Sequence, residues 1–116
     1  MGFLDKKLNE EKLNELSFLD CINYLQVKSK DLSYNKESNN AYWEAKEIIA
    51  YLIKRYCKEY NFTSDNYKEN EIGGLLYSTN FDLGGYSKYD NKKAIATFKA
   101  DMEDNTGRLI NHIKNN

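Results

Sequence analysis

The stretch that decides the fold is residues 41–60, which reads AYWEAKEIIAYLIKRYCKEY. Its apolar residues recur at spacings of three and four, so they share one face of a helix, and the charged residues fall largely on the other faces. The residues assigned to the buried face are Ala41, Ala45, Ile48, Ile49, Leu52, Tyr56 and Tyr60. We expect one of residues 38–40 to cap this helix and Asn61 to end it.

A second long helix is predicted from about Asn91 to Lys114, with Asp90 as its N-cap. Gly107 is costly inside a helix and marks a bend, a close crossing or a break. We favour one continuous helix, because the apolar spacing runs through the glycine. The residues of its apolar stripe are Ile95, Phe98, Met102, Thr106, Leu109 and Ile113.

Ser17 followed by Asp20 predicts the capped start of another helix, since the hydroxyl and the carboxylate can cover free amides of the first turn. Its expected buried residues are Phe18, Cys21, Ile22 and Leu25. Upstream, a shorter amphipathic helix is indicated by Phe3, Leu4, Leu8, Leu13 and Leu16. Residues 28–40 lack apolar periodicity and are predicted to form a connecting loop.

Residues 61–90 are ambiguous. A short helix starting near Ser64 is one interpretation, and a strand in which Tyr77, Thr79 and Phe81 alternate with polar residues is the other. The glycine pairs at 73–74 and 84–85 favour tight turns or positive backbone angles over a ligand role. The predicted fold is therefore mainly α, a single domain over residues 1–116 with four or five helices and an irregular or short-hairpin segment around residues 72–90.

The composition is typical of a folded domain and argues against a membrane-spanning or secreted protein. The chain has 116 residues, 41% of them hydrophobic and 30% charged, which is typical of one folded domain. No apolar run approaches the length of a membrane span, and the N-terminus has charged residues where a signal peptide has its apolar core. We therefore expect a cytoplasmic protein without a membrane partner. The frequent Asn, Lys, Tyr and Ile, all encoded by A/T-rich codons, suggest a bacterial, phage or mobile-element origin.

No catalytic motif supports an enzyme, and no cofactor is predicted. Neither glycine pair belongs to a phosphate-binding or dinucleotide-binding motif. With one histidine and no closely spaced cysteine pair, a metal site is not expected either. Cys21 and Cys57 lie in helical patterns among apolar residues, which favours two reduced, buried thiols, although a disulfide between them is an alternative.

Arg108 and His112 lie one helical turn apart on the same face of the last predicted helix. The pair resembles the arginine and histidine of helical-bundle ribonucleases of the HEPN class, in which four to six residues intervene; here there are three. The resemblance implies an arginine that orients a scissile phosphate and a histidine that transfers a proton. The alternative is an exposed histidine near a helix C-terminus, where its cationic form suits the helix dipole.

The clearest regional signal is an acidic, aromatic segment. Residues 61–90 hold two lysines against five acids, a net charge of −3, and six aromatic residues. Tyrosines offer large contact areas at low entropic cost, and carboxylates around them steer a basic partner. The other interpretation is that some aromatic residues fill the core. The candidate partner-binding residues are Asp65, Tyr67, Glu69, Glu71, Tyr77, Asp82, Tyr86, Tyr89 and Asp90.

The sequence thus favours a small non-enzymatic binding protein that inhibits or regulates a basic partner. The most concrete version is an immunity protein or antitoxin that neutralises a cationic, nuclease-like toxin. A phage or mobile-element inhibitor of a host defence protein is an alternative. A nucleic-acid-binding regulator that uses Lys92, Lys93 and Lys99 is another, disfavoured by the near-neutral net charge of −1. A homodimer is possible, and Tyr42, Trp43 and Tyr51 are candidates for its contact or for core packing.

Overall fold

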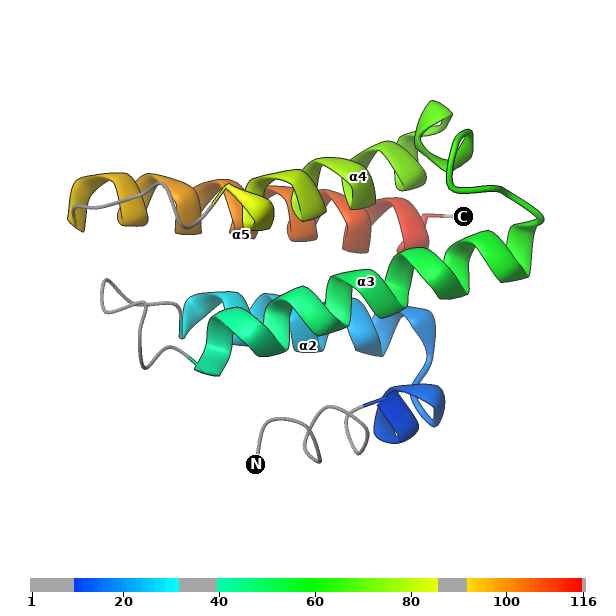
Figure 1. Cartoon of the computed structure of the whole chain (residues 1–116), viewed down its shortest axis with the longest axis horizontal. Coiled ribbons are helices and arrows are strands. Elements are labelled where there is room, and N and C mark those ends of the chain that lie inside the picture. Colours follow the sequence, from blue (N-terminus) through cyan, green and yellow to red (C-terminus); the bar gives the residue numbers. More distant parts are fainter. Residues whose placement is uncertain (1–9, 32–39, 86–91, 116) are drawn as a thin grey trace.

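A computed structural model describes residues 10–31, 40–85 and 92–115 of the chain. These residues form helices and turns, and no strand occurs among them, which confirms the mainly α prediction (Figure 1). Residues 10–14 are helical and precede the longer elements. Those elements are α2 (Phe18–Lys30), α3 (Asn40–Tyr60), the 3₁₀ helix η2 (Tyr67–Glu69), α4 (Glu71–Gly84) and α5 (Lys92–Lys114).

The predicted helix ends are visible at α2 and α3. The Ser17 hydroxyl accepts a 3.0 Å hydrogen bond from the backbone N–H of Asp20, so it caps α2 as expected. Asn61 ends α3 with a φ of 59°, the left-handed conformation that asparagine tolerates after a helix. The predicted cap Asp90, like residues 38 and 39, lies outside the described residues.

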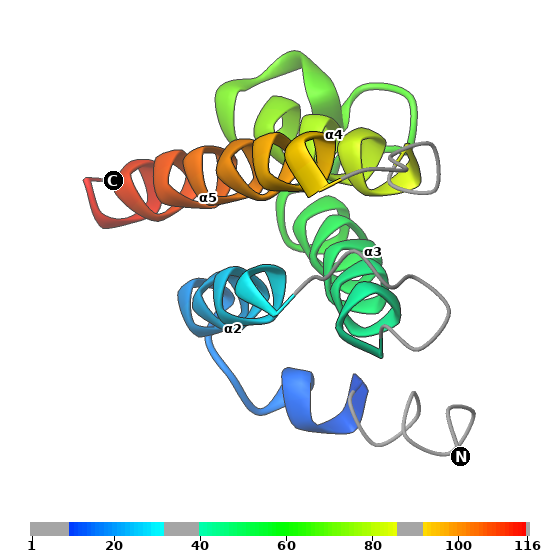
Figure 2. The same ribbon diagram turned by 90° about the vertical axis from the view of Figure 1, so that its left-hand side faces the viewer.

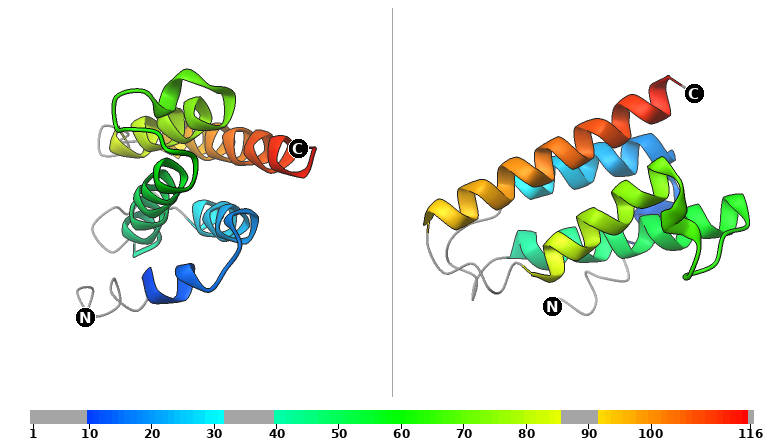
Figure 3. Two further views of the ribbon diagram at one scale, coloured as in Figure 1. Left: turned by 90° about the vertical axis from the view of Figure 1, so that its right-hand side faces the viewer. Right: turned by 90° about the horizontal axis from the view of Figure 1, so that it is seen from above.

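Helices α2 to α5 pack in two layers, with α4 and α5 on one side and α2 and α3 on the other (Figure 2). Viewed from above, the axis of α5 runs along that of α2, and the axis of α4 runs along that of α3 (Figure 3). Each helix therefore packs mainly against two others, in the cyclic order α2, α3, α4, α5. The largest fully buried side chains are Leu13, Ile22, Leu25, Ile48, Ile49, Leu52, Leu76, Leu83, Phe98, Met102 and Leu109.

The segment that the sequence left ambiguous is helical. Residues 71–84 form α4, so the irregular or short-hairpin prediction is wrong as far as Gly85, and residues 86–90 lie outside the described residues. Asn70 caps this helix by accepting a 2.9 Å hydrogen bond from the N–H of Gly73. Burial of Leu76, Thr79 and Leu83 on one face stabilises the helix, since that face completes the core.

Gly73 is needed for a close backbone contact and not for a positive backbone angle. A Cβ atom at this position would overlap the backbone carbonyl oxygen of Tyr67. None of the glycines in the described segments has a positive φ, so the expectation of positive angles is wrong for them. The absence of a side chain at Gly73 lets η2 fold back onto the first turn of α4.

Two expectations about the long helices need comment. Tyr60 was assigned to the core stripe of α3, but its side chain is 60% exposed because the chain turns away immediately afterwards. Phe62 packs where Tyr60 was expected, with the centroid of its ring 5.5 Å from that of the Tyr56 ring. In α5, Gly107 causes no break, and the helix continues through it to Lys114.

Candidate protein-docking surface

The face of α4 that points away from the core carries two aromatic side chains. Because Leu76, Thr79 and Leu83 are buried, helix geometry places Tyr77 and Phe81 on the opposite face, one turn apart. Phe81 is 70% exposed and Tyr77 is 40% exposed. Their rings stack with centroids 6.4 Å apart and an interplanar angle of 29°. Large exposed aromatic side chains in contact with each other are typical of protein-binding surfaces.

We call this face the outer stripe of α4. Apart from the two aromatic residues, this stripe contains only small residues, so the two rings protrude beyond their neighbours along the helix. The residues of the stripe are Gly74, Tyr77, Ser78, Phe81, Gly84 and Gly85. No member of the stripe is charged, although 30% of the chain is.

Carboxylates gather at the N-terminal end of the stripe. Asp65, Glu69 and Glu71 are all exposed there, and one base, Lys68, lies among them. The Lys68 ammonium is 4.7 Å from the centroid of the Tyr77 ring, a cation–π contact. Asp65 and Glu69 form no ion pair with any described residue, so their charges are available to a partner.

The other two predicted acids have partners within the fold. Glu71 contacts Nδ1 of His112 at 3.2 Å, an ion pair when the histidine is protonated. Asp82 is half-buried and accepts a 3.3 Å hydrogen bond from the Asn105 side chain. Burial raises the pKa of the Asp82 carboxyl above its ordinary value, and the negative charge of Asp101 raises it further.

Tyr67 does not belong to the surface. Its side chain is only 6% exposed and is part of the hydrophobic core, and burial raises the pKa of its hydroxyl. The reason is the fold-back of η2 onto Gly73, which carries the ring inward. Tyr86, Tyr89 and Asp90 lie outside the described residues. The structure therefore brings together Asp65, Glu69, Glu71 and Tyr77 of the predicted set, with Asp82 on the same helix.

Phe81 is a candidate binding residue that is absent from the set predicted from the sequence. It belongs to the aromatic residues of the acidic segment. Its spacing of four residues from Tyr77 places both rings on one face in a helix and in a strand alike. The two interpretations differ at Thr79, which shares that face in a strand but is buried on the opposite face of the helix.

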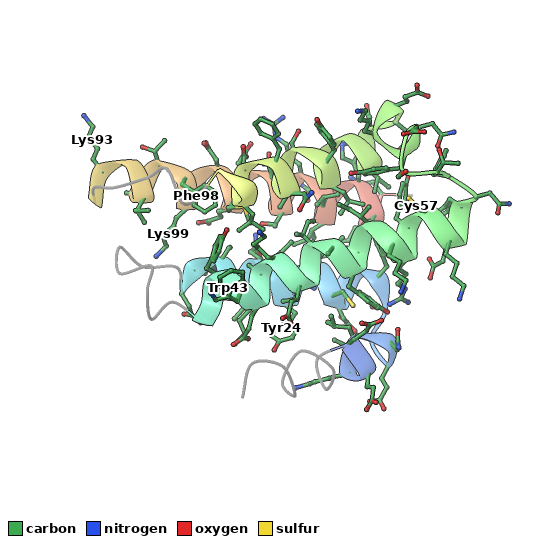
Figure 4. All side chains as sticks on the ribbon, in the orientation of Figure 1. Tyr24, Trp43, Cys57, Lys93, Phe98 and Lys99 are labelled. Atoms are coloured by element: carbon green, nitrogen blue, oxygen red, sulfur yellow. The ribbon has the colours of Figure 1, made fainter. Side chains whose placement is uncertain are left out.

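Another exposed aromatic residue lies on the layer formed by α2 and α3. Trp43 near the start of α3 is 58% exposed, and Figure 4 labels it on the layer away from α4 and α5. It lines an open groove of about 400 Å³ between α3 and the helical residues 10–14. The other lining residues are Glu10, Leu13, Lys46, Glu47, Ala50, Tyr51 and Lys54.

The residues considered for catalysis are engaged in ordinary surface contacts. Nε of Arg108 lies 3.0 Å from the Asp104 carboxylate, and His112 contacts Glu71 on another helix. Cys21 is buried and Cys57 is half-buried, and both are free thiols. Within the described residues no group of three or more His, Cys, Asp or Glu side chains could hold a metal ion.

Comparison of the chain with known protein families, curated proteins and solved structures finds no match. Among the described helices, none combines the length and the apolar character that crossing a membrane would require.

Proposed function

We propose that this chain is a small non-enzymatic binding protein that inhibits a basic partner protein, most concretely an immunity protein for a nuclease-like toxin. One observation carries the proposal: the exposed Tyr77–Phe81 stack lies on α4, and the segment before this helix presents the carboxylates of Asp65 and Glu69, which form no ion pair within the described residues. Together they match a partner surface in which an apolar patch adjoins basic side chains.

The proposed mechanism is occlusion. A nuclease binds its substrate through basic side chains that contact phosphates. Asp65 and Glu69 would take the places of those phosphates, while Tyr77 and Phe81 would anchor the complex by apolar burial. Charge attraction would speed association, and the aromatic contacts would slow dissociation.

The test is affinity capture from the native host with the wild-type chain, the Phe81→Ser variant and a matched control, Trp43→Ser. Both substitutions remove an exposed aromatic ring, but only the first alters the outer stripe. We expect the wild type and Trp43→Ser to retain a basic protein whose nuclease activity they inhibit, and Phe81→Ser to lose it. Capture of no protein, together with substrate turnover by the purified chain, would refute the proposal.

A charge variant tests the electrostatic part separately. Glu69→Lys reverses one unpaired carboxylate and leaves both rings in place. We expect slower association and a weaker dependence of the association rate on salt. An unchanged association rate would show that the carboxylates do not guide the partner.

A nucleic-acid-binding regulator is the second candidate, favoured by the start of α5. Residues 92–100 contain three lysines and no acid, and the side chain of Lys93 is exposed. If these lysines contact phosphates, the affinity for RNA or DNA in a gel-shift assay should fall steeply with salt, and Lys93→Glu should weaken binding. Absence of a shift at low salt would exclude this function.

A further inference from the structure

Four of the six members of the outer stripe of α4 form a pattern that reads the same in both directions. These are Gly74, Tyr77, Phe81 and Gly84, with spacings of three, four and three residues. Read backwards, the order is again small, aromatic, aromatic, small with the same spacings. A face with this property can pair with an identical antiparallel face, because each aromatic residue then meets an aromatic residue and each glycine a glycine.

Gly84, at one end of this pattern, permits close approach, because a Cβ atom built there would meet no atom of another described segment within 4 Å. At the other end the carbonyl oxygen of Lys68 lies 3.3 Å from the place of a Cβ at Gly74, so η2 borders the stripe there. Without a side chain at Gly84, a second helix can approach until the aromatic rings of the two copies interdigitate.

The charges around the stripe also fit an antiparallel pair. The N-terminal end of α4 is acidic, with Asp65, Glu69 and Glu71 against a single lysine. At its other end α4 is followed by α5, which begins beyond the end of α4 and returns alongside it in the opposite direction (Figure 1). That first part of α5 has three lysines and no acid, and Lys93 points away from α2 and α3 (Figure 4). Antiparallel pairing places the acidic end of each copy over the basic end of the other.

We propose that the outer stripe of α4 binds the same stripe of a second copy of this chain, which forms a two-fold symmetric antiparallel dimer. The Tyr77 and Phe81 rings form the centre of its interface, and contacts between the Glu69 and Lys93 regions flank it on both sides. The dimer would regulate the docking surface, because it covers the surface and a basic partner must displace the second copy. This regulatory role rests on the proposed function.

Sedimentation equilibrium over a concentration series tests the dimer without any partner. We expect the mass of the wild type to rise from 13.6 kDa towards twice that value. Phe81→Ser should raise the dimer dissociation constant by about tenfold or more, because a central aromatic contact is lost. Trp43→Ser, the matched control, should dimerise like the wild type.

A charge exchange tests the antiparallel arrangement. Lys93→Glu and Glu69→Lys should each weaken the dimer, and the double variant should regain affinity because opposite charges again face each other. A wild type that stays monomeric at millimolar concentration would overturn the inference. A dimer weakened equally by Phe81→Ser and Trp43→Ser, or not rescued by the double variant, would also overturn it. Since partner capture is measured separately, a monomer that still binds the partner would leave the proposed function intact.

Discussion

The hydroxyl of Tyr56 donates a 2.6 Å hydrogen bond to Oδ1 of Asn70, which ties α3 to the beginning of α4. The same oxygen caps α4 through the N–H of Gly73, and the Asn70 amide donates to the carbonyl of Tyr67 at 3.1 Å. One side chain thus joins α3, η2 and α4 at the base of the docking surface.

Asn70→Ala should therefore destabilise the fold more than the loss of an ordinary helix cap does. We expect the free energy of unfolding to fall by about 2–3 kcal/mol, since a helix cap and the acceptor of a half-buried hydroxyl are lost together. Asn70→Asp is the control, because it keeps both acceptor roles and loses only the donor to Tyr67. Denaturant unfolding of the three proteins gives the comparison, and an alanine variant no less stable than the aspartate variant would contradict it.

Gly73→Ala and Gly107→Ala should change stability in opposite directions. At Gly73 the added methyl group overlaps the Tyr67 carbonyl, so we expect a loss of about 3 kcal/mol. At Gly107 a Cβ meets nothing within 4 Å, and alanine in a helix interior should add about 0.5–1 kcal/mol. Thermal and denaturant unfolding measure both; a Gly73→Ala variant as stable as the wild type would show that η2 does not pack tightly on α4.

Arg55 connects α3 to the chain that precedes α2. Its Nη1 donates to the carbonyl of Leu16 at 2.7 Å, while its Nε pairs with Glu59 at 2.9 Å. Arg55→Met should lower the free energy of unfolding by about 1–2 kcal/mol, because the Leu16 carbonyl loses a charged donor. Glu59→Gln removes only the exposed ion pair and should cost about 0.5 kcal/mol or less. Equal effects of the two substitutions would mean that the contact with Leu16 contributes little.

Ionisation of Asp82 should lower the free energy of unfolding as the pH rises above the pKa of a free carboxyl group. Burial holds the pKa of its carboxyl above the unfolded value of 3.8, so the folded chain binds the proton more tightly. Between these two pKa values the folded state carries more protons, and raising the pH through the interval destabilises it. Asp82→Asn keeps an acceptor for Asn105 and removes this penalty.

We therefore expect Asp82→Asn to be modestly more stable than the wild type at pH 7, with a smaller difference at pH 3.8, the ordinary pKa of the carboxyl. Asp101→Asn should shift stability in the same direction by less, since its charge is the smaller cause of the raised pKa. Urea unfolding at both pH values gives the comparison. An Asp82→Asn variant that is less stable at pH 7 would show that the carboxylate is favoured where it lies.

Three of the four long helices could be predicted from local signals in the sequence. In α3 and α5 the apolar residues repeat at three and four positions with charged residues between them, and in α2 a serine marks the start. α4 could not be predicted in this way, because it has large apolar residues on both faces: Leu76 and Leu83 point inward, and Tyr77 and Phe81 outward. Its glycines, which have a low helix propensity, added to the ambiguity.

The candidate site was predictable only in part. The acidic, aromatic character of the segment could be counted, and Asp65, Glu69, Glu71 and Tyr77 are exposed as the docking hypothesis requires. The burial of Tyr67 could not be foreseen, since it depends on the close contact of η2 with Gly73 rather than on any periodicity. Exposure of Phe81 likewise follows from the helical geometry of α4, which the strand interpretation excluded.

The cyclic packing of the four helices has a consequence for synthesis of the protein. Of the four helices α5 leaves the ribosome last, and it packs against both α2, the earliest of the four, and α4. Until α5 emerges, the apolar side chains of α2 and α4 that pack against it remain exposed to solvent. The nascent chain therefore cannot complete its interior before α5 has left the ribosome, and until then its exposed apolar side chains are available to chaperones.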